Sequence, residues 1–206
     1  MRVSVHPDGR VEVVLPPRAT VRDADAAVVE LGPWIARRRA EAAAVAARTA
    51  PAPGTVGYLG TSLTVVRERG RQRVHRVGDK LLVPGDGDDA VAAMERWYRR
   101  QARAEIAPRL DYAVDVLGRS YSALTIRNQR TRWGSCSSSG AMSFNWRLLL
   151  GPEEVLDYVV WHEACHLVHH DHSRRYWALL AKHRPGYREP QRWLAVNGGG
   201  LVLPTP

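Results

Sequence analysis

The stretch His162-Glu163-Ala164-Cys165-His166 is the most informative part of this 206-residue chain, because it places two histidines four residues apart with a glutamate directly after the first. On a helix of about 3.6 residues per turn, side chains at i and i+4 lie one above the other on a single face. The two imidazoles can therefore bind one metal ion. Glu163 lies about 100° around the helix from His162. It is badly placed as a third ligand, but it can reach a water molecule on that ion and accept its proton.

Apolar residues on both sides of this motif predict that it belongs to a buried helix. They recur at helical spacing after a break at Gly151-Pro152, and acidic residues follow directly in the first turn. The apolar residues are Val155, Leu156, Val159, Val160 and Leu167. An exposed helix that merely carries surface histidines would not be so apolar. We therefore interpret the motif as part of a zinc site.

A zinc site that does chemistry normally has three protein ligands and one open position. A histidine further along the same straight helix, such as His169 or His170, cannot be the third ligand. Each turn rises by about 5.4 Å, whereas zinc–nitrogen bonds are about 2.0–2.1 Å long. The third ligand must come from chain that turns back, and His172 lies where the helix is expected to end. Ser173 is then expected to cap a following helix, Arg174–His183.

The histidine spacing equals that of the motif His-Glu-x-x-His-x-x-Gly-x-x-His, but position 169 is His where that motif has Gly. Since that glycine permits a sharp turn, membership of the metzincin clan does not follow. A glutamate ligand from the next helix is another option, yet Asp171 is the only acidic residue between His166 and Glu189, and Glu189 is expected in a loop. We predict His162, His166 and His172 as ligands, with Asp171 as the weaker alternative to His172.

Several further segments occur in an order and spacing that resemble a known family. They are Thr131-Arg132-Trp133-Gly134-Ser135-Cys136-Ser137, Ser143-Phe144-Asn145-Trp146-Arg147-Leu148, Pro152, Asp171-His172-Ser173 and Tyr176-Trp177. Together with His162–His166 they resemble the YgjP-like zinc metallopeptidases, which are related to SprT-like proteins. The resemblance is strongest from about Tyr121 to Leu194. It implies a zincin-type core with the three histidines as ligands and Glu163 as the catalytic glutamate.

The expected fold is α+β, with an N-terminal β-rich lobe attached to a zincin-like core. Residues 1–15 alternate as two strands around a turn at Pro7-Asp8-Gly9, and Val21–Arg48 is expected to be helical. Residues 55–83 have the pattern of short strands separated by glycines. We expect the lobe, including its one helix, to span residues 1–87 and the compact core to span residues 88–206.

The core is expected to contain the active-site helix, a scaffold helix and a small antiparallel sheet. Asp88–Leu117 has the pattern of one long amphipathic helix that packs against the active-site helix. Tyr121–Asn128 and Ala141–Leu149 are expected to be two strands joined by the loop Gly134–Gly140. The resemblance suggests that Met142–Trp146 or its neighbour pairs with an extended substrate through main-chain hydrogen bonds. An ordinary internal hairpin is the alternative.

Three residues are candidates for substrate binding: Asn145, Tyr176 and Arg132. Arg132 and Asn145 could instead anchor the hairpin by hydrogen bonds. A second donor usually stabilises the oxyanion in such reactions, and the nearest candidates are Tyr176, Arg175 and His169. In the expected mechanism zinc lowers the pKa of its bound water to about 7, and Glu163 accepts the proton.

The composition is that expected of a soluble cytoplasmic enzyme. The chain has 45% apolar residues, two cysteines without a Cys-x-x-Cys pair, and neither an 18-residue apolar run nor a signal peptide, so no membrane association is expected. Lys and Arg number 30 against 21 acidic residues, which gives a net charge of +9. Such a surface favours an anionic partner, a nucleotide or a nucleic acid, although many arginines belong to exposed helical faces.

Three functions are compatible with the sequence. The first is a zinc-dependent peptidase that acts on a peptide or protein substrate. The second is a metal-dependent hydrolase of nucleotide phosphoanhydrides, against which stands the absence of a Gly-x-x-x-x-Gly-Lys loop. The third is a nucleic-acid-associated protease or a binding module without catalysis. The intact Glu163 argues against a pure binding module, because a scaffold has no need of that base.

Overall fold

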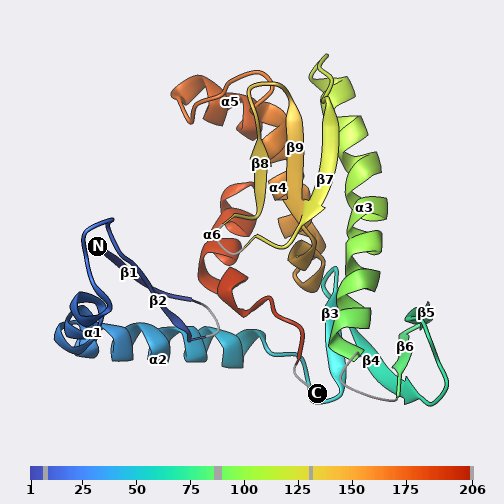
Figure 1. Cartoon of the computed structure of the whole chain (residues 1–206). Helices are drawn as coiled ribbons and strands as arrows, with labels where there is room; N and C mark the ends of the chain where they lie inside the picture. Colours follow the sequence, from blue (N-terminus) through green and yellow to red (C-terminus); the bar gives the residue numbers. More distant parts are fainter. Residues whose placement is uncertain (7–8, 86–89, 130–131, 205–206) are drawn as a thin grey trace. The chain divides into compact units, whose positions relative to one another are not determined.

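The computed structural model describes residues 1–206 except 7–8, 86–89, 130–131 and 205–206 (Figure 1). The chain forms two compact units, Met1–Ala50 with Val196–Leu201 and Pro51–Ala195 with Val202–Pro206. The boundary expected between residues 87 and 88 therefore falls inside the second unit. Two features predicted from the sequence, the turn at Pro7-Asp8-Gly9 and Thr131 of the quoted motif, lie partly or wholly outside the described residues.

The first unit contains one strand pair and two helices. Its elements are β1 (Arg2–Val5), β2 (Val11–Val14), α1 (Val21–Glu30), α2 (Gly32–Thr49) and the short 3₁₀ helix η2 (Gly198–Gly200). β1 and β2 pair antiparallel, and η2 packs against α2. The single helix expected over Val21–Arg48 is wrong, because α1 ends at Glu30 and a new helix begins at Gly32. The backbone N–H of Leu31 bonds back to Ala27 and Val29, which closes α1.

The second unit begins with a four-stranded sheet, and the short strands expected between residues 55 and 83 are confirmed. They are β3 (Thr55–Tyr58), β4 (Thr61–Glu68), β5 (His75–Val77) and β6 (Lys80–Pro84). The spatial order is β3-β4-β6-β5, in which β4 and β6 run parallel and the other neighbours antiparallel.

This sheet is attached closely to the rest of its unit. The hydroxyl of Tyr98 donates to the carbonyl of Gly57 over 2.6 Å, and the backbone N–H of Leu59 donates to the carbonyl of Leu149 over 2.8 Å. A Cβ atom at position 57 would lie 2.5 Å from the carbonyl oxygen of Leu150, so this contact requires glycine. These bonds join the four-stranded sheet to the rest of the second unit.

The long helix α3 (Ala90–Val116) is the scaffold of the second unit. It packs against β6, β7 and α4, and its buried positions include Tyr98, Ile106 and Leu110. The expected scaffold helix is thereby confirmed from Ala90 onward, while residues 88 and 89 lie outside the described residues.

A three-stranded sheet lies beside α3, and it differs from the expected hairpin. Its strands are β7 (Ala123–Arg127), β8 (Gly134–Cys136) and β9 (Ala141–Asn145), in the order β7-β9-β8 (Figure 1). β8 pairs antiparallel with β9, so β7 lies on the other edge of β9, where it runs parallel. The small antiparallel sheet of the prediction is therefore wrong, because part of the expected loop is a third strand and the sheet is mixed.

The strand expected to continue to Leu149 ends at Asn145. The side chain of Asn145 accepts a hydrogen bond from the backbone N–H of Arg147 over 3.1 Å and begins the 3₁₀ helix η1 (Trp146–Leu150). Three helices follow: α4 (Glu153–Cys165), α5 (Arg174–His183) and α6 (Arg188–Asn197). Glu189, expected in a loop, lies in the first turn of α6. No helix of the described residues is long and apolar enough to cross a membrane.

Candidate metal centre

Helix α4 positions the first two histidines of the candidate site. Pro152 precedes the helix, and Glu153 and Glu154 occupy its first turn, where carboxylates interact favourably with the helix dipole. Most of the helix is buried, as the apolar pattern predicts. It runs to Cys165, and His166 is its C-terminal capping residue.

The last four backbone carbonyls of α4 all have hydrogen-bond donors, which explains where the chain turns. The last four carbonyls of a helix have no intrahelical partner. Here the carbonyl of His162 accepts from the Tyr176 hydroxyl over 3.0 Å, and the carbonyl of Cys165 accepts from the backbone N–H of His169 over 3.0 Å. The two carbonyls between them, those of Glu163 and Ala164, accept from the N–H groups of His166 and Leu167. The chain is therefore free to leave the helix axis after His166.

The return of the chain brings His172 back to the helix. The Asp171 carboxylate accepts a hydrogen bond from the backbone N–H of Ser173 over 3.1 Å. The Ser173 side chain accepts from the N–H of Tyr176 and caps α5 at Arg174, as the sequence predicts. His172 is held between these two local bonds at the start of α5.

His162, His166 and His172 lie together, with their ligand atoms all within 4.8 Å of one another. The Nε2 atoms of His162 and His172 are 3.2 Å apart. Two nitrogens on a tetrahedral zinc, with bonds of about 2.0–2.1 Å, lie about 3.3 Å apart, so this pair has the spacing of zinc ligands. Asp171, the alternative third ligand, is not part of the group that the described residues form.

Neighbouring groups orient two of the imidazoles. Nδ1 of His166 lies 3.0 Å from the carbonyl of His169, and Nδ1 of His162 lies 3.4 Å from the Tyr158 hydroxyl. A partner on Nδ1 leaves Nε2 available as ligand, which is a common arrangement around protein-bound metals. The ring of Tyr176 stacks on His166 with centroids 4.7 Å apart.

Burial favours the neutral form of the two helix histidines. The pKa of His162 is lowered to about 3 by its burial and by the neighbouring imidazoles of His166 and His172. Burial also lowers the pKa of His166. Neutral imidazole is the form that binds metal ions.

Glu163 is almost fully buried, with 6% of its surface exposed, and it lies against β8. A Cβ atom at Gly134 would be 2.6 Å from both Cγ and Oε1 of Glu163, so only glycine leaves room for the carboxylate there. Burial raises the pKa of Glu163 to about 7, and the positive charge of Arg132 opposes that rise. Sequence reasoning missed Gly134, although an isolated glycine in a strand often marks a close approach.

The three candidates for substrate binding occupy different positions. Arg132 is exposed and close enough to influence Glu163. Asn145 is 2% exposed, and its amide donates to the carbonyls of Gln129 and Arg132, so it anchors the segment before β8. Tyr176 has no exposed surface, and its hydroxyl is bonded to His162. Of the other oxyanion candidates, Arg175 is exposed, and the carbonyl of His169 lies against the ring nitrogen of His166.

The prediction that Met142–Trp146 pairs with an extended substrate is wrong for β9 itself. β9 is the central strand and is hydrogen-bonded to β7 on one side and to β8 on the other. Its neighbour β8 is an end strand of this sheet and contacts α4.

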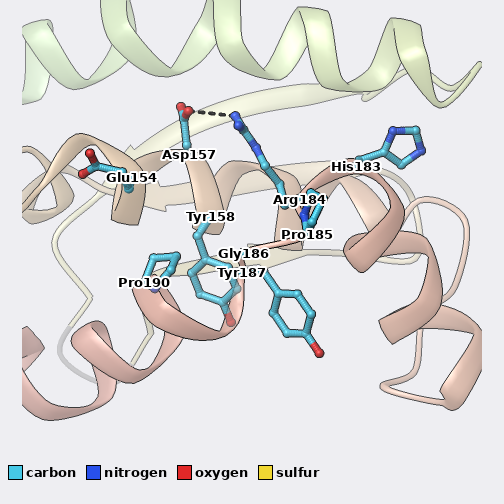
Figure 2. Close-up of a pocket in the computed structure, with 9 residues that line it drawn as sticks. All are labelled: Glu154, Asp157, Tyr158, His183, Arg184, Pro185, Gly186, Tyr187 and Pro190. Atoms are coloured by element: carbon cyan, nitrogen blue, oxygen red, sulfur yellow. Dashed lines mark hydrogen bonds and ion pairs between the residues drawn. The ribbon is translucent and has the colours of Figure 1, made fainter.

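A pocket of about 260 Å³ lies at the N-terminal half of α4 (Figure 2). It is lined by Glu154, Asp157, Tyr158, His183, Arg184, Pro185, Gly186, Tyr187 and Pro190. Asp157 accepts from Arg184, the C-terminal capping residue of α5, over 2.7 Å and from Arg109 of α3 over 3.1 Å. These ion pairs tie the metal-site helix to both neighbours, and no local sequence signal indicates them.

Three imidazoles beside a buried glutamate are a donor set that would suit a hydrolytic metalloenzyme. Comparison with known proteins agrees. The family model described as "YgjP-like, metallopeptidase domain" matches residues 1–197, and the chain belongs to this family. The resemblance found in the sequence is thereby confirmed.

One solved structure similar to this chain is the metallopeptidase zymogen of Pyrococcus abyssi abylysin. The two sequences are 26% identical over 44% of this chain and 92% of that chain, with a TM-score of 0.40. No curated protein matches. The family match lends no support to a nucleic-acid partner.

Proposed function

We propose that this metallopeptidase is zinc-dependent, that His162, His166 and His172 hold the ion, and that Glu163 is its general base. The observation that carries the proposal is the cluster of three imidazole ligand atoms within 4.8 Å of one another, with Glu163 beside it on the same helix. A three-histidine donor set suits zinc and leaves a fourth position for water or substrate. Since His172 is exposed, the site is open to solvent on that side.

When bound, zinc lowers the pKa of water to about 7 and polarises a carbonyl group. The residues of the chain do the rest. Glu163 accepts the proton of the attacking water at its carboxylate and returns it to the leaving amine. Gly134 and the surrounding burial hold that carboxylate in place. The carbonyl of His169 contacts Nδ1 of His166, and the hydroxyl of Tyr158 contacts Nδ1 of His162. These contacts orient both rings and leave Nε2 of each available to a metal ion.

The substrate binds as an extended peptide along β8. This end strand leaves one edge unpaired within its sheet and reaches Glu163 at Gly134. An added strand is recognised through main-chain hydrogen bonds, which tolerate many sequences. Arg132, exposed and near Glu163, contacts the same substrate. Partly unfolded proteins are therefore the expected class of substrate.

The direct test measures zinc and proteolysis together. Purified protein is expected to contain one zinc ion per chain and to cleave an unstructured protein such as denatured casein. A chelator should abolish cleavage, and added zinc should restore it. The same preparations are incubated with a panel of nucleoside triphosphates. Zinc-dependent release of phosphate or pyrophosphate without any proteolysis would contradict the proposal and favour a phosphoanhydride hydrolase.

A further inference from the structure

A second concave surface lies at the N-terminal part of α3, in the same unit as the metal centre. It is a pocket of about 800 Å³ lined by residues 72–76, before and within β5, and by residues of α3 between Arg96 and Gln101. Figure 1 shows β5 and β6 beside this end of α3, whereas α5 lies near the other end. The surface is therefore distinct from the three-histidine cluster.

Arginines dominate this surface. A neighbouring pocket of about 430 Å³ shares Gln72, Arg73 and His75 with the first. We call the two together the arginine groove, which is lined by six arginines: Arg69, Arg71, Arg73, Arg76, Arg96 and Arg100. Glu68 is the one acidic residue among the described lining residues, and it pairs with Arg71 over 2.6 Å.

Four of the groove arginines keep their charge available, unlike Arg99 and Arg109 of α3. Arg99 pairs with Glu95, and Arg109 pairs with Glu105. The positive charge of these two arginines is therefore largely neutralised by the paired carboxylates. In the part of the chain that the structure describes, Arg73, Arg76, Arg96 and Arg100 have no carboxylate partner. No carboxylate of the described residues therefore pairs with these four guanidinium groups.

Uncharged contacts hold two of these side chains in place. The Arg76 Nε donates to the carbonyl of Gly78 over 2.9 Å, and its guanidinium lies 4.8 Å from the centroid of the Tyr58 ring. The Arg100 guanidinium donates to the carbonyl of Arg96 over 3.3 Å. These contacts orient the two guanidinium groups without neutralising their charge. Less side-chain conformational entropy is therefore lost when an anion binds.

The chemistry of the groove suits phosphate. A guanidinium offers parallel N–H donors that match phosphate oxygens in a bidentate manner. Trp97 lines the groove but is only 4% exposed, and no exposed Trp, Tyr or Phe of the described residues lines it. Single strands are usually bound by stacking their bases on such rings. Contact with the phosphate backbone of a duplex, without recognition of its bases, needs no exposed aromatic ring.

We infer that the arginine groove binds the phosphate backbone of double-stranded nucleic acid and docks the peptidase there. This surface does not depend on the metal centre, so the inference stands apart from the proposed function. Each phosphate contacted contributes about −0.9 to the slope of log K against log salt concentration. Four unpaired arginines predict a slope of about −3 to −4.

The experiment measures the fluorescence anisotropy of a labelled DNA duplex of mixed sequence, with the full chain, over a range of salt concentrations. The variant carries Arg96→Glu and Arg100→Glu together, and the control carries the same charge change on exposed residues of the other unit, Arg22→Glu with Arg37→Glu. We expect the groove variant to lose at least 10-fold in affinity with a shallower salt slope. The control should lose less than about 3-fold, as generic charge effects are small and screened. Melting temperature and zinc content, measured on every variant, confirm that each is folded.

Three results would overturn the inference. One is equal loss of affinity in the groove and control variants, since net charge alone then accounts for binding. The second is binding of a single-stranded oligonucleotide or a nucleoside triphosphate in preference to the duplex. The third is binding of polyglutamate as tight as that of the duplex and equally sensitive to the groove substitutions, which would assign the groove to an acidic protein. Unlabelled competitors of each kind distinguish these outcomes.

Discussion

Gly134 of β8 lies directly against the carboxylate of Glu163 on α4, so closely that a Cβ at position 134 would be 2.6 Å from Oε1. Gly134→Ala should therefore displace the carboxylate and leave the three histidines unchanged. A misplacement of about 1 Å at a reacting group can cost about 10²-fold in rate. We expect the hydrolysis rate to fall by about that factor, with zinc content unaltered.

The control for this prediction is Gly32→Ala, because a Cβ at position 32 meets nothing within 4 Å. Steady-state proteolysis and elemental analysis of both variants provide the measurement. A Gly134→Ala protein with normal turnover would show that the position of Glu163 next to β8 has no part in catalysis.

The third ligand can be tested by comparing two adjacent residues. His172→Ala should lower zinc content well below one per chain, because two remaining ligands hold zinc poorly. Asp171→Ala should keep zinc, since the Asp171 carboxylate is bonded to the backbone of Ser173. Zinc is measured by elemental analysis after dialysis. A His172→Ala protein that retained one tightly bound zinc while Asp171→Ala lost it would reverse the assignment.

Tyr176 tests the difference between positioning and catalysis. Tyr176→Phe removes the donor to the carbonyl of His162 at the end of α4. Loss of a buried hydrogen bond costs about 1–3 kcal/mol, which corresponds to a melting temperature lower by roughly 2–12 °C in a chain of this size. We expect that decrease, with the hydrolysis rate of the folded variant changed only a few-fold. An unchanged melting temperature with a rate at least 100-fold lower would instead assign the hydroxyl to the oxyanion.

The charged side chains around Asp157 are expected to stabilise the packing of α4 between α3 and α5. Asp157→Asn keeps the shape of the side chain and weakens its bonds to Arg109 and Arg184 (Figure 2). Because the network is partly exposed, we expect a loss of about 1 kcal/mol and a decrease of about 2–4 °C in melting temperature. The effect should shrink in 1 M salt. Asp25→Asn, on an exposed position of α1, is the control and should change little at either salt concentration.

The geometry around His172 could be predicted from the sequence because every signal for it is local. The i, i+4 pair fixes a helical face, and the rise per turn excludes a third ligand on the same straight helix. Ser173 is a strong capping residue, and it begins α5 where expected. What places His172 is therefore encoded within about ten residues of His162.

The sheet next to Glu163 could not be predicted in the same way. β8 has only three residues, Gly134–Cys136, which is too short for an alternating pattern to appear. The parallel pairing of β7 with β9 and the bonds of Asp157 to Arg109 join residues far apart in the chain. Such long-range contacts produce no periodic pattern in the sequence. The same holds for the break at Leu31, which divides one helical pattern into two helices.

The central claim, that Glu163 is the general base at a zinc site, is tested most directly by Glu163→Gln. Zinc content, melting temperature and hydrolysis rate are measured on one preparation. The variant should keep one zinc per chain and a melting temperature close to that of the unaltered protein, because the amide has the same shape. Its hydrolysis rate should fall by about 10²–10⁴-fold, the usual contribution of a general base. A zinc-loaded, stable and fully active Glu163→Gln protein would contradict this mechanism.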